Sequence, residues 1–102
     1  MITIVFRMVI KKGKEEEFKN LTKELTKSAY KDSERCVQYM FHQSVDDPKE
    51  FILYEKWRDQ KALDAHINRL ITLLGPREKN SILPAKLNDY FEKTEDLLYK
   101  ES

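Results

Sequence analysis

The sequence predicts a single α+β domain of the ferredoxin-like type, in which helices cover one face of a four-stranded antiparallel sheet. Three observations lead to this prediction. The chain has 102 residues, which is the length of one domain. Several stretches are rich in β-branched and aromatic side chains. Amphipathic segments separate them in the order strand, long helix, strand hairpin, helices and strand.

Residues 1–10 predict the first strand, because β-branched and aromatic side chains dominate both of its faces. Only Arg7 interrupts the apolar pattern, so this side chain needs a partner or a wet edge. A turn around Gly13 follows. Residues 14–30 then predict a helix, since apolar side chains recur at helical spacing among lysines and glutamates. The positions at this spacing are Phe18, Leu21, Leu25, Ser28 and Ala29.

Residues 36–45 and 50–57 predict the second and third strands, joined by a turn at 46–49 in which Pro48 presets the backbone angle. Simple alternation divides each strand into two faces. In the second strand, Val37, Tyr39, Phe41 and Gln43 oppose Cys36, Gln38, Met40 and His42. In the third strand, Phe51, Leu53, Glu55 and Trp57 oppose Ile52, Tyr54 and Lys56.

Asp59 is suited to cap a helix that begins near Gln60. This helix carries an apolar stripe and should break or bend at Gly75 and Pro76. A second helical piece is expected over residues 77–82, and residues 85–93 predict the fourth strand. The tail after residue 95 is too apolar to be free. The stripe consists of Leu63, His66, Ile67, Leu70 and Leu74.

The helices can cover only one face of this sheet. The other face stays apolar through Val5, Val9 and one set of hairpin aromatics, so a second copy of the chain should cover it. We therefore expect a homodimer.

Composition excludes several classes of partner. The chain has 19 basic and 18 acidic side chains, so no charge excess favours nucleic acid or a membrane surface. No apolar run approaches the roughly 20 residues of a membrane span, and the first residues lack the features of a signal peptide. Cys36 is the only cysteine, which excludes a disulfide within the chain and favours a cytoplasmic protein.

Residues 34–66 carry a more specific sequence pattern than the rest of the chain. Their order resembles the antibiotic biosynthesis monooxygenase family, and the resemblance extends over nearly the whole chain, so residues 1–102 are expected to form one such domain. Arg35 stands where the family usually has glycine, so the turn before the second strand is expected to differ. The matching features are Gly13, Glu34-x-Cys36, Tyr39, Pro48, Phe51-x-x-Tyr54-Glu55-x-Trp57 and His66.

The resemblance implies a homodimer whose two sheets pack into a barrel-like centre, the dimeric α/β-barrel assembly. It also implies a pocket between the sheet and the helices of each subunit. Several members of the family oxygenate phenols or quinols without metal or flavin. Others degrade heme or isomerise a phosphorylated sugar-derived diketone, so the fold alone does not choose the reaction.

The heme-degrading branch can be tested residue by residue. Its members resemble one another in an asparagine on the first strand, a tryptophan ending the third, and a histidine about ten residues later. Here Trp57 matches, Phe6 replaces the asparagine, and Ile67 replaces the histidine with His66 beside it. We therefore expect no heme, and no metal or flavin cofactor.

His66 is the candidate catalytic residue. It lies on the helix stripe that faces the sheet, where a neutral imidazole could accept a proton from a phenol or enol. The alternative is a hydrogen-bonded histidine at the edge of the core. His66 and His42 lack metal-ligand spacing, and no Cys/His/carboxylate cluster accompanies them.

The candidate substrate-binding residues are Trp57, Tyr54, Phe6 and Glu55. Trp57 could stack a ring substrate, although a core aromatic is the alternative. Glu55 could act as a base, although an ion pair with Arg7 or with a basic helix residue is the alternative.

Three functions follow from this pattern. The first is a cofactor-independent monooxygenase acting on a small phenol, quinol or related enolisable aromatic. Such a substrate anion can pass one electron to oxygen directly, if the protein supplies a dry pocket, a proton acceptor and orientation. The second is an isomerase of a small phosphorylated carbonyl compound, for which Arg69, Arg77 and Lys79 could serve the phosphate. The third is a non-catalytic dimer that binds a small molecule.

Overall fold

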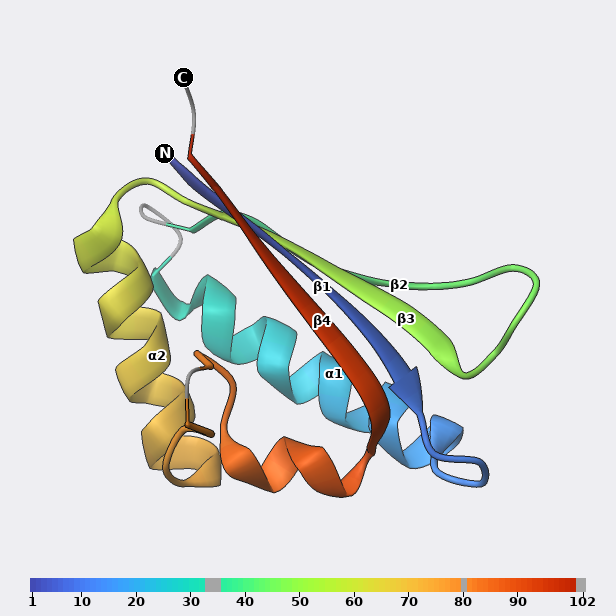
Figure 1. Ribbon diagram of the computed structural model, residues 1–102. Coiled ribbons are helices and arrows are strands. Elements are labelled where there is room, and N and C mark those ends of the chain that lie inside the picture. Colours follow the sequence, from blue (N-terminus) through green and yellow to red (C-terminus); the bar gives the residue numbers. More distant parts are fainter. Residues whose placement is uncertain (33–35, 80, 101–102) are drawn as a thin grey trace.

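The structure is a computed structural model that describes residues 1–32, 36–79 and 81–100. Its strands form one antiparallel sheet in the order β2-β3-β1-β4, and both long helices lie on the same side of it (Figure 1). The predicted α+β ferredoxin-like fold is therefore confirmed. The turn containing Glu34 and Arg35 lies outside the described residues. The elements are β1 (Ile2–Ile10), α1 (Glu15–Ala29), η1 (Tyr30–Asp32), β2 (Cys36–Gln43), β3 (Glu50–Trp57), α2 (Gln60–Leu74), η2 (Ala85–Asp89) and β4 (Phe91–Lys100).

Alternation along β1 and β3 decides which side chains meet the helices. The register pairs Ile4 with Glu55 and Phe6 with Leu53, and all four side chains are buried. The helices contribute apolar positions at three- and four-residue spacing, as the sequence predicts. The core therefore lies between the sheet and the two helices. Its helical part includes Phe18, Leu25 and Ala29 from α1 and Leu63, His66, Ile67 and Leu70 from α2.

The predicted faces of β2 are wrong at the start of the strand. Its pairing with β3 shifts by one residue between Cys36 and Gln38, which is a β-bulge that inserts Val37. Cys36 and Tyr39 are therefore both buried although they are an odd number of positions apart, and Val37 is exposed. The uninterrupted hairpin register between the bulge and the turn pairs Tyr39 directly with Glu55.

Local signals fix both ends of α2. The Asp59 side chain accepts a hydrogen bond from the backbone N–H of Ala62 and so caps the helix, as predicted. Gly75 follows the last helical residue with φ +97°, in the left-handed region that strains other residues. None of the helices in the described ranges is long and apolar enough to span a bilayer.

Two predictions for the last third of the chain are wrong. Apart from residue 80, which is not described, the segment 77–82 is not helical, and an isolated β-bridge joins Arg77 to Pro84. Residues Ala85–Asp89 form the short helix η2, in which the backbone N–H of Leu87 donates a hydrogen bond to the carbonyl oxygen of Pro84 at the N-cap. The fourth strand consequently begins at Phe91, and it includes the apolar tail as far as Lys100.

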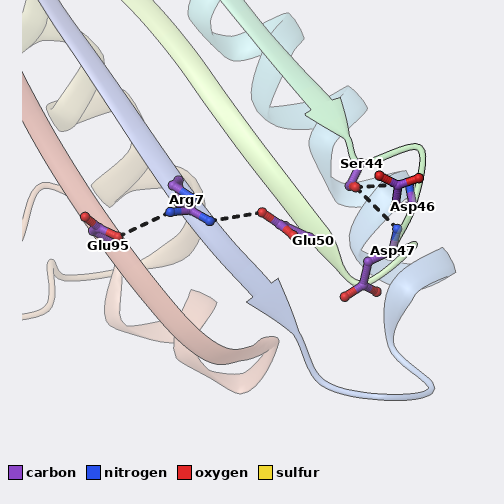
Figure 2. Close-up of polar contacts among 6 residues, drawn as sticks. All are labelled: Arg7, Ser44, Asp46, Asp47, Glu50 and Glu95. Carbon is purple, nitrogen blue, oxygen red and sulfur yellow. Dashed lines mark hydrogen bonds and ion pairs between the residues drawn. The ribbon is translucent and has the colours of Figure 1, made fainter.

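Arg7 lies on the sheet face turned away from the helices. It is placed between two carboxylates, with its Nη2 atom 3.2 Å from Glu50 Oε1 and its Nη1 atom 3.8 Å from Glu95 Oε2 (Figure 2). These ion pairs are solvent-exposed and so add little stability. The predicted pair between Arg7 and Glu55 is wrong, because Glu55 faces the helices.

We expect a second copy of the chain to cover this open face, on which Val5 is half-buried in one subunit. Val5→Asp should weaken a homodimer at least about tenfold, because the interface would then bury an unpaired carboxylate. Val45→Asp is the matched control, since Val45 lies between β2 and β3 and is 98% exposed. Analytical ultracentrifugation in the micromolar range measures the effect. A parent protein that stays monomeric, or two variants that dimerise equally, contradicts the expectation.

Candidate functional site

His66 of α2 lies against Trp57, the last residue of β3. The two rings are stacked, with centroids 4.5 Å apart and planes inclined by 30°. Their side chains are 1% and 0% exposed. The short link through the Asp59 cap starts α2 three residues after Trp57, and nearly two helical turns then bring His66 back over the strand. The prediction that His66 faces the sheet is confirmed.

Glu55 precedes Trp57 by two residues on β3, and its side chain points toward the stacked rings of Trp57 and His66. Trp57 Nε1 donates a hydrogen bond to Glu55 Oε1 over 2.7 Å. His66 Nε2 lies 4.0 Å from the same oxygen, which is too long for a hydrogen bond. Among the described residues, Trp57 is the one donor to this carboxyl group. A fully buried carboxyl with a single donor is costly as an anion.

Burial shifts the pKa of Glu55 and the pKa of His66 in opposite directions. It raises the pKa of Glu55 to about 7, and the hydrogen bond from Trp57 only partly opposes this shift. Burial lowers the pKa of His66 to about 3, and the positive charge of Arg69 adds to the effect. Near neutral pH the imidazole is uncharged, so its contact with Glu55 is not an ion pair. Glu55 is the group of the two that changes protonation near neutral pH.

Tyr39 of β2 borders the stack. Its ring is edge-on to His66 at 5.2 Å and to Trp57 at 6.4 Å. Burial, followed by the charges of Glu55 and Cys36, raises the Tyr39 pKa well above its usual range, so the phenol keeps its proton at neutral pH. We call Tyr39, Glu55, Trp57 and His66 the buried cluster.

The structure separates the five predicted site residues into two groups. Glu55, Trp57 and His66 come together in the buried cluster. Phe6 is buried on the same sheet face but pairs with Leu53, two register positions away from Glu55. Tyr54 alternates with Glu55 along β3, so it lies on the open face and does not approach the cluster.

Tyr39, which belongs to the buried cluster, and Arg69, which lies beside it, were not predicted as members of a monooxygenase site. Tyr39 was placed on the face of the second strand that carries Phe41 and was given no role in the site, because its position opposite Glu55 depends on the register of the hairpin. Arg69 lies one helical turn after His66 and was considered only as a phosphate ligand. Within the described ranges, no three His, Cys, Asp or Glu side chains are grouped to hold a metal ion.

Two hollows lie beside the cluster, and they have no lining residue in common among the residues that the structure describes. The α1–β2 hollow, of about 400 Å³, meets the cluster at Tyr39. The α1–α2 hollow, of about 620 Å³, approaches the cluster through Arg69. The first is lined by Thr22, Lys23, Thr26, Tyr30, Tyr39, Met40 and Phe41. The second is lined by Glu24, Lys27, Ser28, Lys31, Asn68, Arg69, Thr72 and Leu73.

Comparison of the sequence with protein families decides the affiliation. The profile of the antibiotic biosynthesis monooxygenase family matches residues 1–69, which include the entire buried cluster. The chain belongs to the antibiotic biosynthesis monooxygenase family. A search of curated proteins finds no match.

Solved structures support the same fold over almost the whole chain. A conserved protein from Methanosarcina mazei is 29% identical with a TM-score of 0.74, over 99% of this chain and 92% of that one. A Nitrosomonas europaea protein, provisionally assigned to the antibiotic biosynthesis monooxygenases, is 22% identical with a TM-score of 0.79, over 99% and 98%. A single-residue mutant of SnoaB, a cofactor-independent oxygenase from Streptomyces nogalater, is 15% identical with a TM-score of 0.72, over 98% and 91%.

Proposed function

We propose that this member of the antibiotic biosynthesis monooxygenase family oxygenates a small phenol, quinol or related enolisable ring without a cofactor. Glu55 is the proton acceptor in this proposal. The observation that carries it is the buried carboxyl group with a single hydrogen-bond donor and a pKa near 7. A general base is most effective when its pKa lies near the working pH, and His66 is too weakly basic to meet this condition.

The substrate ring binds in the α1–β2 hollow in this proposal. Tyr30, Tyr39 and Phe41 give the hollow aromatic walls suited to a flat ring. In this proposal the Tyr39 hydroxyl carries the substrate proton toward Glu55; Tyr39 lines the hollow and pairs with Glu55 on the neighbouring strand. His66 stacks on Trp57 and holds its indole N–H toward the carboxyl group.

The reaction balances without an external reductant. Transfer of a substrate proton to Glu55 gives an electron-rich anion, which passes one electron to oxygen, and the resulting radical pair joins in a carbon–oxygen bond to give a peroxide anion. The peroxide anion takes the proton back from Glu55 and becomes a hydroperoxide. Glu55 then accepts the remaining proton of that carbon, the O–O bond breaks, and a carbonyl group is left. The departing hydroxide takes this proton from Glu55 and leaves as water. One oxygen atom enters the product and the other enters water, and the substrate supplies all the electrons.

Oxygen uptake with a panel of quinols, naphthols and anthrone-type ketones tests the proposal. Because such compounds also react with oxygen unaided, Glu55→Gln protein serves as the matched blank. We expect uptake above this blank, with one labelled oxygen atom in the product when labelled oxygen gas is used. Uptake equal to the blank for every compound contradicts the proposal.

The isomerase remains an alternative because Arg69 lines the larger hollow next to the cluster. Arg77 and Lys79, the other two predicted phosphate ligands, are exposed and do not line it. An isomerase would use Glu55 for proton transfer but would consume no oxygen. Exchange of substrate protons with deuterated water, without oxygen uptake, would identify this reaction.

His66→Gln should reduce turnover at least about tenfold, because the indole loses the ring that holds it against Glu55. The free energy of unfolding should fall by an amount on the order of 1 kcal/mol. Steady-state kinetics and thermal melting measure the two effects together. Unchanged turnover with a large loss of stability would mean that His66 is only a core residue.

A further inference from the structure

The α1–α2 hollow has the dimensions and position of a second ligand site. Its volume of about 620 Å³ lies within the range of small-molecule pockets. Glu24, Lys27 and Ser28 of α1 form one wall, and Asn68 and Arg69 are part of the opposite wall on α2. The proposed oxygenation does not use this hollow, so an inference about it does not depend on that reaction, although the isomerase alternative would place its phosphate here.

Arg69 is the unusual side chain of this hollow. Its Nε and Nη2 atoms are buried and have no hydrogen-bond partner among the described residues. A guanidinium group stays charged at all ordinary pH values. A buried charged donor without an acceptor is costly, and native proteins seldom leave one unsatisfied. Because the Nε and Nη2 atoms have almost no accessible surface, an acceptor that enters the hollow reaches them only when the Arg69 side chain turns toward it.

The charges around the hollow determine the sign of that acceptor. Among the described residues of the lining, Lys27, Lys31 and Arg69 are basic and Glu24 is the one acidic side chain. Glu24 lies 3.7 Å from Lys27 and offsets its charge. Lys31 and Arg69 remain as an excess of positive charge. The neutral amide and hydroxyl groups in the lining, from Asn68, Ser28 and Thr72, are compatible with a polar ligand.

We propose that the α1–α2 hollow binds a small organic oxyanion, a carboxylate or a phosphate, held by the guanidinium group of Arg69. The planar fork of an arginine matches two oxygens of either group. Leu73 lines the hollow and is 52% exposed, which provides an apolar surface for the organic part of the ligand. The site is thus distinct from the aromatic hollow at Tyr39.

Nuclear magnetic resonance titration of the full chain tests this proposal directly. The probes are phenyl phosphate and benzoate, and sodium chloride at equal ionic strength corrects for screening. We expect saturable shifts of the Arg69 Nε–H signal and of the Ser28 and Asn68 amide signals for at least one probe. The tighter of the two probes distinguishes a phosphate from a carboxylate ligand. Shifts that do not saturate, or that sodium chloride reproduces, overturn the proposal.

Two substitutions sharpen the test. Arg69→Gln should weaken binding by about ten- to a hundredfold, because a charge-assisted hydrogen bond is lost. Arg77→Gln is the matched control, since Arg77 is exposed and does not line the hollow, and its binding should stay within about twofold. If Arg69→Gln does not fold, Arg69→Lys keeps the charge and removes the fork, and should still weaken binding. Equal binding by the Arg69 variants and the parent overturns the proposal.

Discussion

Glu55→Gln is expected to be less active and more stable than the parent protein. Loss of a general base should lower turnover by about 10²–10⁴-fold. The amide oxygen can still accept the hydrogen bond from Trp57, so the packing of the buried cluster is kept. The variant no longer buries a group that ionises near neutral pH. At alkaline pH its free energy of unfolding should therefore exceed that of the parent by an amount on the order of 2–3 kcal/mol.

The direction of this stability change follows from the two pKa shifts. The Glu55 pKa is raised from 4.5 to about 7, so the unfolded chain loses its proton first and stability falls as the pH rises through this window. The His66 pKa is lowered from 6.5 to about 3, so stability falls as the pH drops from 6.5 toward 3. The two effects oppose each other between 4.5 and 6.5. The Glu55→Gln substitution should abolish the loss of stability at alkaline pH and leave the loss of stability at acidic pH in place.

Glu50→Gln is the matched control for this experiment. Glu50 begins the same strand but lies with Arg7 on the open face, so its substitution should leave turnover unchanged. Urea unfolding at several pH values gives the stabilities, and steady-state kinetics give the rates. Equal activity of the Glu55→Gln and parent proteins would remove Glu55 from the reaction. Equal stability of the Glu55→Gln and parent proteins at alkaline pH would show that burial of the ionised Glu55 carboxylate is not costly.

Trp57→Ala should destabilise the protein by about 3–5 kcal/mol, the usual cost of deleting a buried aromatic side chain. Trp57 is fully buried, stacks on His66 and donates to Glu55, so the deletion removes both a packing contact and a hydrogen bond. Chemical unfolding measures the loss. A cost below about 1 kcal/mol would contradict this packing.

Trp57→Phe separates the two contributions of the indole. The ring remains and stability should fall much less, but the N–H donor to Glu55 is lost. Turnover should rise with pH as Glu55 loses its proton and becomes able to accept one from the substrate. The hydrogen bond from Trp57 lowers the Glu55 pKa, so its removal should shift this rise in turnover to higher pH. A pH profile that stays in place would mean that the indole N–H does not influence the catalytic group.

The sequence was sufficient for the parts of the fold that rest on local signals. Strand alternation identified the helix-facing residues of β1 and β3, and the Asp59 cap identified the start of α2. The faces of β2 were mistaken because a bulge depends on the partner strand and not on the residues around Val37 alone. The fourth strand was placed too early, since Pro84 and the residues after it form a helical turn.

The candidate site was predicted only in part. Spacing alone brought His66 toward the sheet and placed Glu55 beside Trp57 on one strand face. The relative basicity of His66 and Glu55 was not predictable, because it depends on burial and on the charge of Arg69. Tyr54 was grouped with them, although adjacent strand residues point to opposite faces.

The pH dependence of kcat/KM for oxygen uptake, compared between the parent and Glu55→Gln, tests the central proposal most directly. The parent should gain activity as the pH rises through about 7, where Glu55 loses its proton. In Glu55→Gln the remaining activity should be low and should lack this step. A step of unchanged position and height in Glu55→Gln would contradict the assignment of Glu55 as the proton acceptor.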